Sequence, residues 1–171
     1  MVLDLSNFTE PLARTPRMLR AIIEGQPDSW LDSRHGPELL SPRQTVAHLI
    51  LIDRESWVQR IRRALTGEST PALNIEEDEL LATATVAELL TEFEKLRPQR
   101  IQELKDLQLT EEDFKKPGTH ARFGPFIVEE LLTTWVAHDI YHMGQIFKSY
   151  SAQYVGKIGP WQNFLNLPQF N

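Results

Sequence analysis

A chain of 171 residues with 41% hydrophobic and 25% charged residues is long enough for one globular domain, residues 1–171, and too ordinary in composition for a disordered protein. Its net charge of −6 and its lack of a basic run beside aromatic residues argue against nucleic acid as a partner, and without cysteine any metal site must use nitrogen and oxygen ligands. No apolar run approaches the roughly 18 residues that span a bilayer and no signal-peptide pattern opens the chain, so we expect a cytoplasmic protein without a membrane partner.

Two amphipathic helices are predicted in the first part of the chain. Apolar residues at helical spacing indicate a helix over about residues 9–24, which ends before Gly25. Ser41 and Pro42 form an N-cap followed by a first-turn proline, so a second helix is predicted over residues 42–66. The segment between these helices contains proline and glycine and is expected to be a loop.

A long connection and a third helix come next. Residues 68–85 are acidic and irregular, and their length suits a crossover rather than a tight hairpin. Thr85, with Glu88 three residues later, has the pattern of a capping box and opens a third helix predicted over residues 86–108. Pro98 lies inside this helix and is expected to kink it.

The last part of the chain predicts a fourth helix and a tail. The run TEEDFKKPGTHARFGPF is expected to be a second loop, and Pro125 opens a helix over residues 125–150. The tail, residues 155–171, has too much glycine and proline for a long helix, but its aromatic residues predict a non-helical segment that packs on the bundle. Four helices without a strand pattern predict an all-α four-helix bundle.

Three histidines lie on the predicted inner faces of the helices. His138 and His142 are four residues apart on the fourth helix, so their side chains share one face and lie about 5 to 6 Å apart. Burying imidazoles without partners is costly, and a bound metal ion removes that cost. His48 lies among apolar residues of the second helix. The histidine pair alone is a weak signal, but three inward histidines on two helices predict one divalent metal site.

The chain resembles the DinB-like (YfiT-like) metal-binding four-helix bundles over nearly its whole length. The resemblance is carried by SPRQTVAHLILIDRESWVQR, which contains His48, and by ELLTTWVAHDIYHMGQI, which contains His138 and His142. The segments FEKLRPQRIQEL, THARFG and YVGKIGPWQNFL are similar to one subgroup of that family. The resemblance implies that the three histidines are the metal ligands of a bundle with up-up-down-down connectivity and a long crossover between helices 2 and 3. It also implies a homodimer.

The donor set limits the metal and its chemistry. Three neutral imidazoles leave at least one position of a tetrahedral ion open, as in catalytic rather than structural sites. Imidazole ligands suit zinc, nickel, copper or iron, of which we expect zinc or nickel first. The resemblance implies a thiol-transferase, in which the metal lowers the pKa of a low-molecular-weight thiol cosubstrate and the thiolate attacks a small-molecule substrate.

Two other functions remain open. HDIYH is similar to the HExxH motif of zinc hydrolases, with Asp139 as general base, although aspartate is shorter than glutamate and no third ligand follows downstream. A metal-stabilised binding or stress protein would instead hold a small ligand without turning it over. A transferase needs both metal and thiol to consume an electrophile, a hydrolase needs no thiol, and a binding protein does neither.

Further polar residues are candidates for the surroundings of the metal. Glu55 lies two turns beyond His48 on the same face, where it could be a fourth ligand, a base or an ion-pair partner of an arginine. His120, in the THARFG loop, could cover the mouth of the site, but a solvent-facing side chain is the favoured interpretation. Gln145 could line the cavity or cap a polar neighbour. Asp139, if it is not a base, is expected to make a hydrogen bond behind the ligands or a salt bridge between helices.

Overall fold

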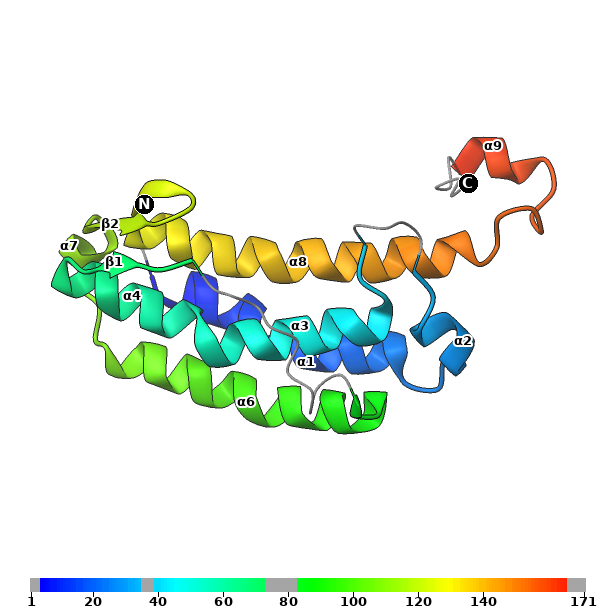
Figure 1. The fold of residues 1–171 in the computed structure, drawn as a ribbon, viewed down its shortest axis with the longest axis horizontal. Helices are drawn as coiled ribbons and strands as arrows, with labels where there is room; N and C mark the ends of the chain where they lie inside the picture. The colour runs from blue at the N-terminus through cyan, green and yellow to red at the C-terminus, as the bar shows by residue number, and fades with distance from the viewer. Residues whose placement is uncertain (1–3, 35–38, 73–82, 166–171) are drawn as a thin grey trace.

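The computed structural model of the chain describes residues 4–34, 39–72 and 83–165, and its long helices lie side by side along the longest axis of the molecule (Figure 1). The long helices are α1 (Ser6–Ile23), α3 (Pro42–Glu55), α4 (Trp57–Thr66), α6 (Val86–Asp106) and α8 (Val128–Ala152). The short elements are α2 (Asp28–Leu31), β1 (Ser69–Thr70), α7 (Glu111–Phe114), β2 (Pro117–His120), β3 (Gly124–Ile127) and α9 (Trp161–Leu165). Within the described ranges, none of the helices combines the length and apolar character that crossing a membrane requires.

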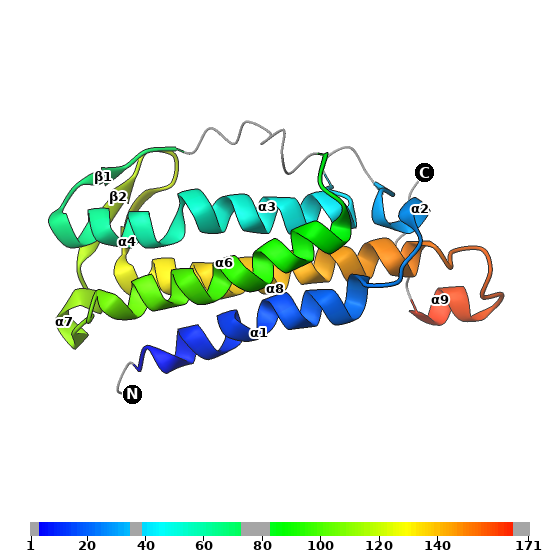
Figure 2. The ribbon, with the colours of Figure 1, turned by 90° about the horizontal axis from the view of Figure 1, so that it is seen from below.

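The predicted helical bundle is confirmed, with one helix divided in two. The second predicted helix is interrupted at Ser56, whose φ of −121° and ψ of −72° are not helical. α3 and α4 follow one another along the same side of the bundle on either side of this residue (Figure 2). They therefore fill the place of one helix in the four-helix arrangement.

Two apolar clusters show the direction in which each helix runs. The first cluster joins the beginning of α1 and of α8 to α4 and the end of α6, and the second joins the end of α1 and of α8 to the beginning of α3 and of α6. α1 and α8 therefore run in one direction, and α3, α4 and α6 run in the other (Figures 1 and 2). The first cluster includes Phe8, Leu12, Trp57, Ile61, Ile101, Leu104, Leu132 and Trp135, and the second includes Leu19, Ile23, Val46, Leu49, Leu89, Phe93, Met143 and Ile146.

The predicted up-up-down-down connectivity is wrong, because the helices follow the order up-down-down-up. β1 follows α4, β2 follows α6 and α7, and the two strands pair in parallel, so α4 and α6 finish at the same end of the bundle. The connection from α4 to α6 therefore joins opposite ends of the molecule, which agrees with a long crossover between helices 2 and 3. Apolar spacing identifies the buried stripe of a helix but not its direction, since a helix and its reverse bury the same stripe.

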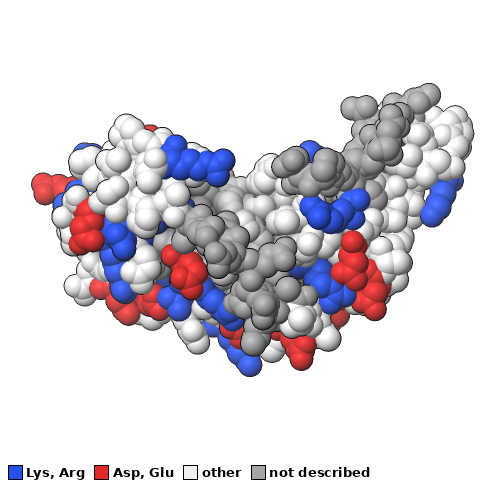
Figure 3. Space-filling model, in the orientation of Figure 1, with Lys and Arg blue, Asp and Glu red and all other residues white. Residues whose placement is uncertain are grey.

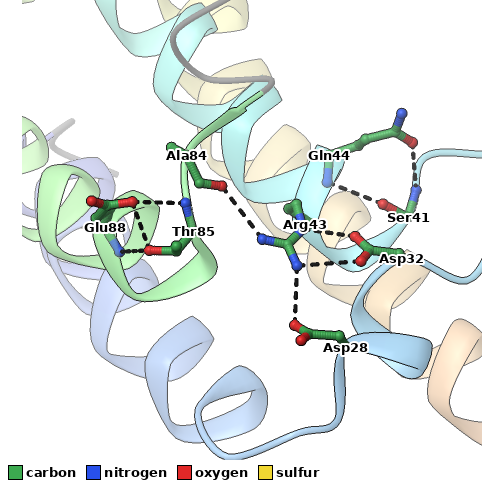
Figure 4. A network of polar contacts seen from close by, with 8 residues as sticks. All are labelled: Asp28, Asp32, Ser41, Arg43, Gln44, Ala84, Thr85 and Glu88. Atoms are coloured by element: carbon green, nitrogen blue, oxygen red, sulfur yellow. Dashed lines mark hydrogen bonds and ion pairs between the residues drawn. The ribbon is translucent and has the colours of Figure 1, made fainter.

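Two long helices begin with a capping box. At the start of α3, the Ser41 hydroxyl accepts a hydrogen bond from the Gln44 backbone N–H, and the Gln44 side chain accepts one from the Ser41 N–H, at 3.2 and 3.0 Å. Thr85 and Glu88 make the same pair of bonds at the start of α6, at 3.3 and 2.8 Å (Figure 4). These bonds satisfy backbone donors that the first turn of a helix leaves free.

Arg43 connects the two capped helices to α2. Its Nε donates to Asp32 at 2.6 Å, its Nη2 to Asp28 at 3.2 Å, and its Nη1 to the Ala84 carbonyl just before α6 at 3.4 Å (Figure 4). Apolar contacts alone resist sliding weakly, whereas directional bonds from one guanidinium fix relative positions. Arg43 thus helps to set the height of α3, which carries His48, within the bundle.

The second predicted loop contains a small sheet, which is a correction to the all-helical expectation. β2 pairs in parallel with β1 and antiparallel with β3, and the helix expected from Pro125 begins instead at Val128. The sheet lies close to α4, since a Cβ on Gly118 would be 3.0 Å from Ala64 Cβ and 2.6 Å from the Phe126 ring. These short strands lack an alternating apolar pattern, and their pairing depends on a segment from a distant part of the chain, so local spacing does not reveal them.

The tail is also different from its prediction. It forms the short helix α9 within residues predicted to be non-helical, and Trp161 and Phe164 are 66% and 83% exposed instead of packed. α9 stands apart from the ends of the long helices in Figure 1. Gly156 and Gly159, with φ of +77° and +58°, turn the chain away from α8 in conformations that favour glycine. Residues 166–171 of the predicted tail lie outside the described residues.

Candidate metal centre

Three histidine side chains converge between α3 and α8. His48 comes from α3, and the helical pitch places His138 and His142 one above the other on α8. The Nε2 atom of His138 lies 3.3 Å from Nε2 of His48 and 3.2 Å from Nε2 of His142. The ligand atoms of all three residues lie within 4.8 Å of one another. The fold thus brings together the three histidines that the sequence singles out.

The spacing of these nitrogens fits a single metal ion. Zinc–nitrogen bonds of about 2.0 to 2.1 Å at a tetrahedral angle place two ligand atoms about 3.3 Å apart, close to both measured distances. Hydrogen bonds among the three imidazoles do not account for both short contacts. The Nε2 atom of His138 carries at most one hydrogen, but it lies close to two other ring nitrogens. A cation bound by three lone pairs resolves this conflict. Among the described residues, no carboxylate joins the group.

Neighbouring side chains contact two of the three imidazoles. The Nδ1 atom of His142 lies 2.7 Å from Gln145 Oε1, and because an amide oxygen only accepts hydrogen bonds, Nδ1 donates and Nε2 keeps its lone pair. The Gln145 amide nitrogen in turn donates to the Tyr141 hydroxyl at 3.1 Å. The Trp57 ring packs edge-on against His138 with ring centroids 5.3 Å apart. Gln145 therefore caps a polar neighbour, the second of the two roles considered for it.

The environment of the cluster keeps its imidazoles neutral. Burial, followed by repulsion from His142, lowers the pKa of His48 to about 4 and that of His138 to about 3. Burial also lowers the pKa of His142, although its hydrogen bond to Gln145 opposes this change. All three side chains therefore offer lone pairs at neutral pH, as metal ligation requires.

The metal-free protein is expected to lose stability as the pH falls from 7 to about 5. The folded-state pKa values of His48 and His138 lie below the ordinary 6.5, so the unfolded chain binds more protons in this range. Asp53 acts in the opposite direction, because burial raises its pKa to about 6 despite Arg97, but it is one group against three histidines. Urea unfolding at a series of pH values with a chelator present measures the effect. A free energy of unfolding that stays flat or rises toward pH 5 would contradict it.

A buried ion-pair network lies behind the cluster. Arg97 of α6 is fully buried and donates to Asp53 of α3 at 2.6 Å and to both oxygens of Asp139 of α8 at 2.5 and 3.1 Å. The fourth contact of the guanidinium reaches the Leu12 carbonyl of α1 at 3.3 Å, and Trp135 Nε1 donates to Asp53 at 3.2 Å. One arginine thereby joins all the long helical segments except α4. Because Asp53 and Asp139 share helices with His48 and His138, the network positions those helices relative to one another.

The structure corrects two interpretations of individual residues. Asp139 is 2% exposed with both oxygens bound to Arg97, so the expected interhelical salt bridge is confirmed, and this carboxylate is not free for the general-base role that the rival hydrolase hypothesis gave it. His120 is 6% exposed on β2, so the favoured solvent-facing interpretation is wrong. Glu55 is exposed at the end of α3, and its carboxylate is not among the converging ligand atoms.

Sequence analysis missed Arg97 and Asp53 as members of the ion-pair network, although a signal for them existed. Arg97 follows Phe93 by four residues and precedes Ile101 by four, so a charged residue occupies the buried stripe of α6. Asp53 and Asp139 stand in the buried stripes of α3 and α8 in the same way. Charges at core positions of three helices indicate that these residues pair with one another, since an isolated buried charge is very costly.

Comparisons with known proteins agree with the fold. Residues 12–146 match the DinB superfamily. The chain is also similar to a solved structure described as "YfiT from Bacillus subtilis is a probable metal-dependent hydrolase with an unusual four-helix bundle topology". The TM-score is 0.71 at 24% identity, over 89% of this chain and 87% of that chain, which shows a common fold. No curated protein matches the chain.

Proposed function

The chain belongs to the DinB superfamily, and from this premise we propose that it is a metal-dependent enzyme of the thiol-transferase type. His48, His138 and His142 would hold one divalent transition metal ion, with zinc or nickel as the first expectation. The observation that carries this proposal is the convergence of three Nε2 atoms at distances suited to one ion. The three histidines and the fold support metal binding, and the thiol-transfer reaction is the part of the proposal that extends beyond them.

The residues around the histidine cluster are compatible with a nucleophile that a cosubstrate supplies. When bound, a divalent ion lowers the pKa of a thiol or water that occupies its open position. The chain contains no cysteine, so a thiol nucleophile would enter as a separate small molecule. Gln145 fixes the tautomer of His142, and Trp57 supplies an apolar wall beside His138. These side chains orient the ligands and limit water on one side of the site.

Hydrolysis is the second candidate function, favoured by the description of YfiT as a probable metal-dependent hydrolase. Arg97 binds both oxygens of the Asp139 carboxylate, so if this chain is a hydrolase, another residue must act as the base. A binding or stress protein without turnover is the third candidate. The expected homodimer and cytoplasmic location remain proposals.

Acidic and basic side chains are interspersed over the described part of the face in Figure 3.

A thiol-dependent assay separates these functions. We expect zinc- or nickel-loaded protein to consume an activated aryl halide only when a low-molecular-weight thiol is also present, because the chain supplies no nucleophile of its own. Release of nitrophenol from an ester without thiol would instead favour a hydrolase. If metal-loaded protein binds thiols but consumes neither probe, the binding-protein function replaces both enzymes. His142→Ala, which removes one ligand, is the control for catalysis by free metal.

A further inference from the structure

His120 presents a buried hydrogen-bond donor without a partner. Its Nδ1 accepts hydrogen bonds from the backbone N–H groups of Arg122 and Phe123 at 3.0 and 3.3 Å. A ring nitrogen that accepts two such bonds carries no hydrogen, so the neutral imidazole has its hydrogen on Nε2. This Nε2 is buried and has no hydrogen-bond partner in the part of the chain that the structure describes. A buried donor left in this state is costly unless a ligand completes it.

Thr70 adds a second unpartnered group beside it. Thr70 and His120 are register partners in the parallel pair of β1 and β2, so their side chains point to the same side of the sheet. Both occupy buried positions, on the side that contacts α4, and the Thr70 hydroxyl is buried without a partner within the described residues. The sheet thus presents two free polar groups toward one helix.

Arg60 of α4 brings a positive charge to the same place. Its side chain is half-buried, and within the described ranges its guanidinium makes no hydrogen bond or ion pair. It lies over the Trp57 ring, 5.7 Å from the centroid. Burial and then the charge of Arg60 lower the pKa of His120, and the same charge contributes to the lowered pKa of His138. The charge of Arg60 therefore acts on both histidines.

We propose that Arg60, Thr70 and His120 bind the carboxylate of a small-molecule ligand whose other end reaches the histidine cluster. Each of the three groups can donate a hydrogen bond, and a carboxylate accepts several. His120 is neutral, and Arg60 is the half-buried charge of the group, because Arg122, whose charge also lowers the pKa of His120, is exposed to solvent. One half-buried positive charge matches a carboxylate better than a doubly charged phosphate. Trp57 contacts both Arg60 and His138 and so links the two parts of the site. The part of this proposal that places the other end of the ligand at the metal rests on the proposed function, whereas the carboxylate site does not.

The first experiment uses metal-free protein and so does not depend on metal binding. Imidazole nitrogen resonances of His120 are followed by NMR during titration with propionate and, separately, with inorganic phosphate. We expect a saturable shift of Nε2 with propionate. Arg60→Gln should abolish it, whereas Arg62→Gln, which removes an exposed arginine of the same helix, should leave it unchanged. If propionate gives no saturable shift the proposal fails, and if phosphate alone gives one the carboxylate assignment is overturned.

The second experiment tests the connection to the metal centre in cobalt-loaded protein. Mercaptoalkanoates of increasing chain length are compared with mercaptoalkanols of the same length by their sulfur-to-cobalt absorption. At the length that spans both sites, we expect the acid to bind about tenfold or more tightly than the alcohol, the effect of a hydrogen-bonded charge pair. His120→Asn keeps an acceptor for the turn but removes the Nε2 donor, and it should reduce this preference, as should Arg60→Gln.

The two experiments fail in different ways. If the protein does not bind cobalt but shows the expected shift with propionate, the proposed metal enzyme is refuted and the carboxylate site remains. Equal affinity for acids and alcohols at every length in cobalt-loaded protein would refute the connection between the sites. Circular dichroism of Arg60→Gln and His120→Asn confirms that each variant is folded, and Arg62→Gln controls for the loss of positive charge.

Discussion

Alanine in place of His48, His138 or His142 is expected to lower the affinity for zinc or nickel by more than about 100-fold, because replacing even a residue that only supports a ligand costs 10 to 100-fold. Each histidine supplies one of three converging Nε2 atoms, so no described neighbour can substitute for a lost ligand. Metal per chain after dialysis, and titration calorimetry for each variant, measure the effect.

Two variants outside the cluster serve as controls for metal binding. Glu55→Ala and His120→Asn are expected to retain the metal, since neither side chain belongs to the converging group. Full occupancy in His48→Ala would contradict the three-histidine site and leave only the pair on α8. Loss of metal in Glu55→Ala would instead reveal a carboxylate ligand and shift the expected metal toward iron.

Arg97→Met is expected to lower the free energy of unfolding by about 3 to 5 kcal/mol at neutral pH, the typical cost of breaking a buried ion pair from one side. Arg97 is fully buried and is bound to Asp53 and Asp139. Without it both carboxylates remain buried and uncompensated. Urea unfolding of metal-free protein at pH 7 gives the difference directly.

Arg20→Met is a matched control for this variant. Arg20 also pairs with a carboxylate, Glu94, at 2.7 Å, but its side chain is 26% exposed, so the expected loss is within about 1 kcal/mol. The pH supplies a second check. Burial already raises the pKa of Asp53 to about 6, and removing Arg97 raises it further, so the loss in Arg97→Met should shrink as the pH falls from 7 to about 6, because the Asp53 carboxyl of the variant takes up a proton in this range. Equal losses in Arg97→Met and Arg20→Met would show that the network contributes no more than a surface pair.

The sequence by itself determined the features that depend on neighbouring residues. Helical pitch places His138 and His142 on one face whatever the rest of the fold does. The Ser41 and Thr85 capping boxes depend on residues only three positions away, and both are present as predicted. The convergence of His48 on this pair was expected because inward positions on two packed helices face a shared core, although its role as a ligand remains a prediction.

Tertiary structure alone decided how distant segments meet. The up-down-down-up order depends on which ends of the helices pack together, and a buried stripe is the same in either direction. His120 is buried because its strand pairs with Thr70 of β1, fifty positions earlier in the sequence. Arg97 finds Asp53 and Asp139 on two other helices. Local spacing specifies a face of each element, whereas these contacts follow from the requirement that every buried donor, acceptor and charge obtain a partner from wherever the packing places one.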